Sequence, residues 1–159
     1  MSNIFKGILV ALFLFQFTVS DAQISNKSKL QRNIPEIVLE MFSQKFPSQD
    51  PVWFSQYQVI YNQKLVFMGK FIFDNRYSSA VYDKEGNLIA FAATIEKNEL
   101  PDKVIKYMTE KFPSFPIAEA LLVTRNLNDV TFEIGIYINN QFVIEVFSEN
   151  GDFIKSTKG

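Results

Sequence analysis

The side chains that most often carry out catalysis are missing from this chain of 159 residues, because it contains neither histidine nor cysteine. It therefore has no imidazole base, no thiol nucleophile and no disulfide. Two carboxylates at a defined separation could still hydrolyse a glycosidic bond. The acids fall mainly on expected helix surfaces and turns, where charged side chains are usually solvated. These acids are Glu36, Glu40, Asp102, Glu110 and Glu149. We expect no catalytic residue and no enzyme activity, and a carboxylate-dependent polysaccharide hydrolase is the alternative.

An oxygen-rich segment around Gly86, from Asp83 to Asn87, looks something like a calcium-binding loop. However, the glutamate that an EF-hand needs six residues after its glycine would fall at Ala92, and the expected flanking elements are strands. A hairpin loop is the simpler interpretation. The similar segment from Glu149 to Asp152 supports it, because both loops then need the same backbone. We expect no metal ion and no cofactor.

Aromatic residues are abundant, with 17 Phe, 6 Tyr and 1 Trp, and most of them are expected in the core. Trp53, Tyr57 and Tyr61 share one face of an expected strand. If that face meets a helix, they belong to the core; if it points away, they form an aromatic strip that suits a protein partner. The candidate partner-binding residues are Trp53, Tyr57, Lys70, Glu133 and Tyr137.

The pattern of the elements that position these residues occurs twice, since the Ile34-Pro35 start of one helix pattern returns 66 residues later at Leu100-Pro101. The helices are predicted over 35–46 and 101–112, each stopped by a Phe-Pro pair. The predicted strands are 52–61, 65–73, 77–82 and 88–95, then 117–124, 130–138, 141–147 and 153–155. This pattern predicts an α+β fold. It is a tandem duplication of a helix plus a four-stranded antiparallel meander, with the two helices packed on one face of a continuous antiparallel sheet.

The hairpin around Asn139-Asn140 presents a conflict between turn and core. A strict two-residue loop pairs Ile136 with Val143 and Ile134 with Glu145, which puts a carboxylate beside the core. A β-bulge would move Glu145 away from that position. The sequence leaves the register of this hairpin open between these two possibilities.

The predicted domain organisation begins with a secretory signal peptide over residues 1–22, which has an apolar run and small residues at Ser20-Asp21-Ala22. A flexible leader over 23–33 follows. The first repeat is predicted over 34–97 and the second over 98–159, and together they form one globular domain. No later segment is apolar over membrane length, so no membrane anchor is expected after cleavage. The net charge of −1 argues against a nucleic-acid partner, and we expect a monomer.

The order of these elements resembles that of the bacterial periplasmic PepSY-like family, also described as β-lactamase-inhibitor-like. The likeness rests on the proline-started helices and on Tyr82-Asp83-x-x-Gly86-x-Leu88, and the second copy departs from it with Ser148 in place of Asp83. The resemblance implies a helix-backed sheet, an envelope location and no known catalysis. For the inhibitor relatives it also implies a protein partner on the sheet. We therefore expect an exported, non-catalytic binding or inhibitor-type module, periplasmic or secreted, that holds a protein or peptide on the open sheet face.

Overall fold

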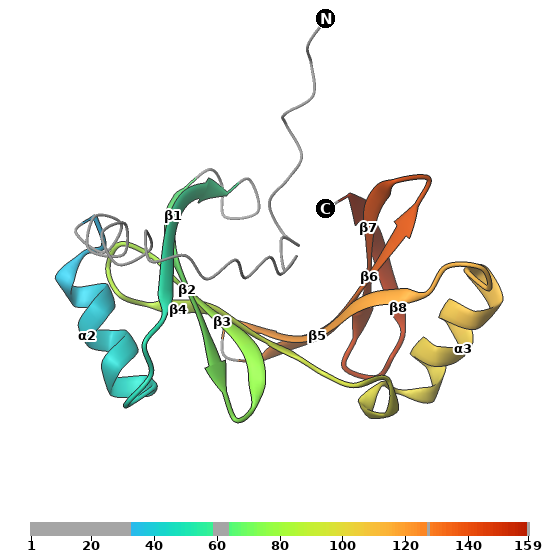
Figure 1. The fold of residues 1–159 in the computed structure, drawn as a ribbon, viewed down its shortest axis with the longest axis horizontal. Coiled ribbons are helices and arrows are strands. Elements are labelled where there is room, and N and C mark those ends of the chain that lie inside the picture. Colours follow the sequence, from blue (N-terminus) through green and yellow to red (C-terminus); the bar gives the residue numbers. More distant parts are fainter. Residues whose placement is uncertain (1–32, 59–63, 127, 159) are drawn as a thin grey trace, which may run out of the picture. The chain divides into compact units, whose positions relative to one another are not determined.

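The structure is a computed structural model that describes residues 33–58, 64–126 and 128–158 (Figure 1). The predicted signal peptide and nearly all of the predicted leader lie outside these residues. The helices are α2 (Glu36–Lys45), the short 3-10 helix η2 (Lys97–Glu99) and α3 (Asp102–Lys111). The strands are β1 (Val52–Gln58), β2 (Lys64–Phe73), β3 (Arg76–Tyr82), β4 (Leu88–Thr94), β5 (Ile117–Arg125), β6 (Asp129–Ile138), β7 (Gln141–Ser148) and β8 (Phe153–Lys158). None of the described helices is long and apolar enough to cross a membrane.

The predicted fold was wrong in its organisation. A duplicated helix-plus-four-strand meander is not what the structure shows. The described residues form mostly one eight-stranded antiparallel sheet, whose strands follow each other in chain order from β1 to β8, with only two α-helices. The physical reason is that helix stops and hairpin turns recur wherever the same local backbone is needed. Their recurrence in the sequence does not by itself require a repeated structural unit.

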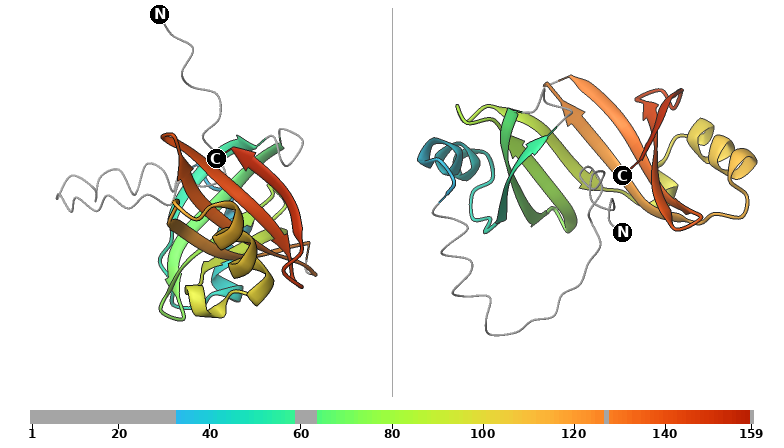
Figure 2. Two further views of the ribbon diagram at one scale, coloured as in Figure 1. Left: turned by 90° about the vertical axis from the view of Figure 1, so that its right-hand side faces the viewer. Right: turned by 90° about the horizontal axis from the view of Figure 1, so that it is seen from above.

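The described residues divide into two compact units, which we treat separately. One unit contains α3 and comprises Thr94–Val123 and the segment from Asp129 onward. The other contains α2 and comprises the described residues up to Ala93 together with Thr124–Asn128. Figure 2 shows the ribbon of each unit from two further sides. The repeat boundaries inferred from the sequence stay a prediction.

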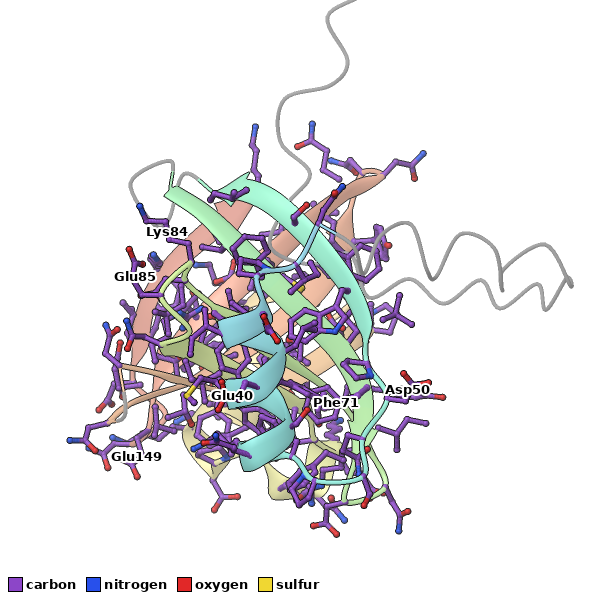
Figure 3. The ribbon with its side chains drawn as sticks, turned by 90° about the vertical axis from the view of Figure 1, so that its left-hand side faces the viewer. Glu40, Asp50, Phe71, Lys84, Glu85 and Glu149 are labelled. Carbon is purple, nitrogen blue, oxygen red and sulfur yellow. The ribbon has the colours of Figure 1, made fainter. Side chains whose placement is uncertain are left out.

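Aromatic rings form the core of the α2 unit. Phe42 is 2% exposed, and its ring centroid lies 5.3 Å from that of Trp53 and 4.9 Å from that of Phe71, in edge-to-face contacts. Trp53 is 3% exposed and therefore belongs to the core, which was the first of its two interpretations. Glu40, in contrast, is exposed on α2, while Phe71 is buried on β2 (Figure 3). Because α2 has one apolar side, it buries that side against the sheet and leaves the other to solvent.

Aliphatic side chains dominate the core of the α3 unit. Val104 and Met108 of α3 are buried in one cluster with Ile134 and Ile136 of β6 and with Phe147 of β7. Since side chains alternate along a strand, the buried isoleucines define the helix-facing side of β6. The residues between them face the other side.

The hairpin between β6 and β7 keeps the strict two-residue register. Ile134 pairs with Glu145 across the two strands, without a register shift. Of the two registers that the sequence left open, the structure has the strict one. Asn139 and Asn140 have φ angles of 49° and 62°, and positive φ at both central residues is what a tight hairpin turn of this kind requires. The turn thus dictates the register, and Glu145 stays on the helix-facing side.

Tyr82 carries a buried hydroxyl that should respond to pH. Its side chain is 1% exposed, and no described residue forms a hydrogen bond with its hydroxyl. Burial disfavours the tyrosinate and raises the pKa of Tyr82 from 10.0 to about 12. The pKa of Tyr82 is higher in the folded than in the unfolded protein. The contribution of the neutral Tyr82 side chain to the stability of the fold is therefore complete below pH 10.0, and it is lost as the pH rises through about 12.

We expect Tyr82→Phe to be neutral or to stabilise the fold by about 1 kcal/mol at neutral pH, since it removes a buried donor without a partner among the described residues. The variant should also lose less stability than the wild type under alkaline conditions. Urea unfolding at neutral pH and at about pH 11 measures both effects. Tyr77→Phe is the matched control, because Tyr77 is 42% exposed. A Tyr82→Phe variant clearly less stable than wild type at neutral pH would contradict this account.

Candidate partner-binding surface

Each unit has a sheet face that does not meet its helix, and we call this the open face. In the α2 unit, Phe67 and Phe71 of β2 lie in the core under α2. Strand alternation therefore places Lys70 and Ile72 on the open face. The register puts Val52 of β1 opposite Lys70 and Tyr77 of β3 opposite Ile72, so these residues share that face.

Four large apolar side chains on this open face are exposed to solvent. Their exposed fractions are 47% for Val52, 39% for Phe54, 55% for Ile72 and 42% for Tyr77. We call these four residues the apolar patch. They come from the beginning of β1 and from the hairpin that joins β2 to β3. Exposed apolar groups that gather in one place mark interaction surfaces more often than scattered ones do.

Part of the open face in this unit is buried. Val66, Val81 and Ala90 form a separate buried cluster, and each of them is less than one-tenth exposed. This cluster continues the open face along β2, β3 and β4, away from the apolar patch. Among the described residues of this unit, the large exposed apolar side chains on the open face are therefore those of the patch, at one end of the strands.

Lys70 lies beside the apolar patch, as one of the residues predicted from the sequence. Its Nζ atom is 5.1 Å from the centroid of the Phe54 ring, which is within the range of a cation–π contact. The ammonium group thus leans from β2 over β1. Tyr57 pairs with Leu65 in the register, but its side chain and all of Tyr61 lie outside what the structure describes.

Glu133 and Tyr137 belong to the other unit, on β6. They alternate with the buried isoleucines, so both lie on the open face of that unit. Tyr137 is 39% exposed, and its ring centroid lies 5.0 Å from that of Phe142. Glu133 is only 5% exposed. Of the predicted residues in this unit, Tyr137 is therefore accessible to a partner and Glu133 is nearly inaccessible.

A buried polar cluster around Glu145 was not predicted as a site. Glu145 is 1% exposed, and its carboxylate accepts hydrogen bonds from the Tyr107 hydroxyl at 3.2 Å and from the Ser156 hydroxyl at 2.7 Å. Lys111 donates a hydrogen bond to the Tyr107 hydroxyl, and this bond raises the pKa of Lys111. The strict hairpin register was the signal that could have found the cluster. The polar cluster connects α3 to β7 and β8.

The two buried acids of the β6–β7 hairpin point to opposite faces of the sheet. Glu145 lies opposite Ile134, on the helix-facing side, whereas Glu133 lies opposite Val146 on the open face. A pair of carboxylates that acts on one glycosidic bond must flank that bond from within one cleft. Glu133 and Glu145 do not have this geometry.

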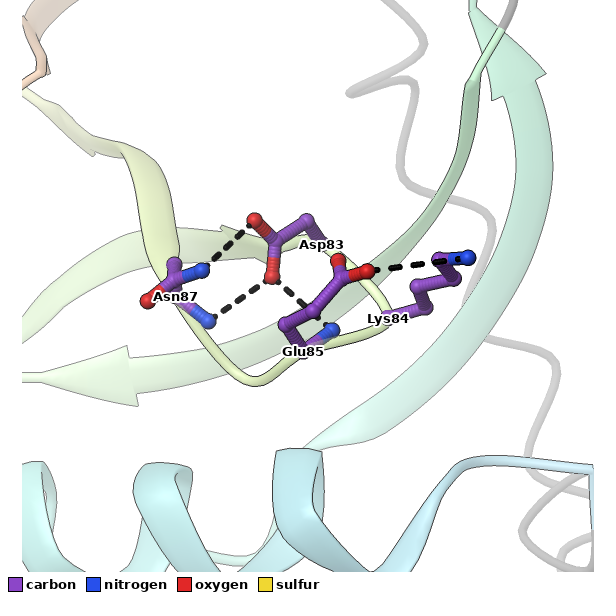
Figure 4. Close-up of polar contacts among 4 residues, drawn as sticks. All are labelled: Asp83, Lys84, Glu85 and Asn87. Atoms are coloured by element: carbon purple, nitrogen blue, oxygen red, sulfur yellow. Dashed lines mark hydrogen bonds and ion pairs between the residues drawn. The ribbon is translucent and has the colours of Figure 1, made fainter.

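The oxygen-rich segment after β3 is a hairpin loop, as predicted (Figure 4). One carboxylate oxygen of Asp83 accepts the backbone N–H groups of Glu85 at 3.0 Å and of Asn87 at 2.9 Å. The other accepts the side-chain amide of Asn87 at 2.9 Å. Gly86 has a φ of 84°, the left-handed conformation that favours glycine. Both carboxylate oxygens of Asp83 thus accept hydrogen bonds from within the loop. No group of potential metal ligands occurs among the described residues.

No protein-family model and no curated protein sequence matches the chain. Several solved structures do match it. A Bacteroides eggerthii protein provisionally described as periplasmic has a TM-score of 0.67 and 11% identity, over 78% of this chain and 88% of that one. A DUF2874 family protein from Bacteroides uniformis has a TM-score of 0.66 and 12% identity, over 78% and 88%. A BLIP-like protein from Bacteroides fragilis has a TM-score of 0.59 and 14% identity, over 78% and 86%. What the chain shares with these proteins is their fold, which is BLIP-like.

Proposed function

We propose that this protein is an exported, non-catalytic binding module of the bacterial envelope that holds a protein or peptide partner on the open face of its sheet. The observation that carries the proposal is the apolar patch of Val52, Phe54, Ile72 and Tyr77 beside the Lys70 ammonium. The similarity in fold to a BLIP-like protein and to a protein provisionally described as periplasmic supports the same class and location.

The composition of the patch supports binding for energetic reasons. Aromatic side chains bury a large area with little loss of rotamer freedom, and they are enriched among residues that dominate binding energy. Phe54 and Tyr77 supply such rings on strands that do not need to rearrange. Below them, the contact between Trp53 and Phe42 holds β1 against α2. A partner would therefore meet a surface that is already in place, and less of the binding energy would be lost in ordering it.

The alternative, a polysaccharide hydrolase that works through two carboxylates, has less support. Among the described residues, Glu133 and Glu145 are the two acids that lie buried in the sheet, and they face opposite sides of it. We therefore base the experimental test on binding alone.

Site-specific photo-crosslinking in the living cell tests the proposal. A photoreactive residue in place of Ile72 should capture a protein or peptide partner, whereas the same residue in place of Lys106, which is exposed on α3, should not. Phe54→Ala combined with Tyr77→Ala should reduce capture at position 72 by about tenfold, since two aromatic anchors are lost. Equal capture at positions 72 and 106, or capture that ignores the double substitution, would contradict a binding role for the apolar patch.

A further inference from the structure

The strand β1 lies at one end of the sheet. It pairs with β2 in an antiparallel register from Val52↔Lys70 to Gln58↔Lys64, and the sheet order places no strand on its other side among the described residues. The backbone N–H and C=O groups along the outer side of such a strand are available to pair with another extended chain. Proteins that expose an edge of this kind usually protect it with charges, a proline or a bulge.

The two ends of the sheet differ in that protection. The edge strand β8 carries Lys155 and Lys158, and both are exposed. Lysines on an edge strand oppose the addition of a further strand, because pairing would remove their charges from water. The strand β1 has the sequence VWFSQYQ over seven residues and contains no charged residue and no proline. The β1 edge is thus the end of the sheet without such protection.

The β1 edge also borders the apolar patch. Val52 and Phe54 belong to both, while Trp53 between them anchors the strand in the core. A strand added beside β1 would place alternate side chains on the open face, next to Val52 and Phe54. The Lys70 ammonium leans over Phe54 toward this edge, so it disfavours a cation in the added strand and favours a carboxylate.

We propose that the β1 edge takes up an extended segment of the partner as an additional antiparallel or parallel strand. The segment carries apolar side chains at alternate positions on the open face, with an acidic residue near Lys70. Backbone hydrogen bonds then supply affinity, and the apolar patch with Lys70 supplies specificity, as in other cases of strand addition. This inference rests on the proposed function, because it names how and by what kind of segment the open face is occupied.

Hydrogen exchange of the purified exported protein tests the inference with a defined probe. The probe is an acetylated and amidated peptide, Thr-Val-Thr-Glu-Thr-Val-Thr, whose Val, Glu and Val side chains share one face. We expect it to slow exchange at alternate backbone amides of β1 and to leave β8 unchanged, because only the outward N–H groups gain partners. The same peptide with Lys in place of Glu should bind about tenfold more weakly.

Two chemical controls separate strand pairing from contact with the patch alone. In the first control, two versions of the peptide are N-methylated, one on its odd-numbered and one on its even-numbered residues. Only one of these two sets of N–H groups faces β1, so one of the two methylated peptides has to lose the ability to slow exchange of the β1 amides. Val52→Lys should weaken peptide binding by about tenfold, whereas Ile154→Lys on the other edge strand should not. Val52 and Ile154 are 47% and 52% exposed, so both substitutions are compatible with folding.

The outcomes divide cleanly. Photo-crosslinks at the apolar patch, together with a peptide that leaves the β1 amides unchanged, would overturn strand addition while the proposed function stands. An absence of patch-specific crosslinks would overturn the proposed function itself. Slow exchange of the outer β1 amides without peptide would also overturn the inference, because the edge would then already be occupied. If dilution removed that protection, the occupant would be a second copy of the protein. If deletion of residues 23–32 removed it, the occupant would be a segment of the chain itself.

Discussion

Replacing Phe42 with alanine should lower the free energy of unfolding by about 3–5 kcal/mol, a large part of the stability of a domain of this size. Phe42 is 2% exposed. Its ring contacts those of Phe46, Trp53, Phe71 and Tyr82, with centroid distances from 4.9 to 6.4 Å. The variant loses the burial of the ring and leaves a cavity that these neighbours cannot fill without leaving their own positions. Denaturant unfolding measures the difference, and many molecules of the variant should already be unfolded at 37 °C.

Phe54→Ala is the matched control for Phe42→Ala. It removes the same side chain from a position that is 39% exposed, on the open face of β1. The expected loss is below about 1 kcal/mol, because much of the ring is in water in the folded state as well. If the two variants were equally destabilised, the assignment of Phe42 to the core and of Phe54 to the surface would be wrong. The contrast also shows that Phe54 can be changed in binding experiments without loss of the fold.

Valine in place of Gly86 should destabilise the protein by about 1–3 kcal/mol from backbone strain alone. The φ of Gly86 is 84°, which a β-branched residue rarely adopts. A Cβ atom at this position would also lie 2.9 Å from Cγ1 of Ile37 and 3.0 Å from Cγ of Met41, so the loop would have to move away from α2. Gly151 has a φ of 78° and a Cβ there would lie 3.0 Å from Cβ of Pro101, so Gly151→Val should behave in the same way.

Two control variants separate the causes at Gly86. Lys84→Val places the same side chain in the same exposed loop without a positive φ, and it should change stability by less than about 0.5 kcal/mol. Gly86→Asn introduces the Cβ atom but tolerates the left-handed conformation, so it reports the steric part alone. Thermal and denaturant unfolding of the set gives the comparison. Negligible effects at both glycines would argue against the hairpin geometry of the two loops.

The residue types of the chain already decide part of its chemistry. Without histidine and cysteine, imidazole and thiol chemistry are excluded whatever the fold. Local backbone preferences also carry over directly from sequence to structure. Prolines bracket α2 and α3, Asn139 and Asn140 form the tight turn between β6 and β7, and Gly86 closes its loop in the left-handed conformation. These features depend on each residue and its near neighbours, so the sequence is sufficient to predict them.

Only the tertiary structure decided which side of each strand is covered. Alternation along β1 separates Trp53 from Phe54, but it does not say which of the two meets a helix. Contact with Phe42 puts Trp53 in the core and leaves Phe54 in the patch. In the same way, the turn at Asn139-Asn140 set the register that buries Glu145. Hydrogen bonds from Tyr107 on α3 and from Ser156 on the neighbouring strand β8 offset the cost of burying its carboxylate. The continuity of one sheet from β1 to β8 is likewise a matter of long-range strand pairing, which local signals such as helix stops and turns do not encode.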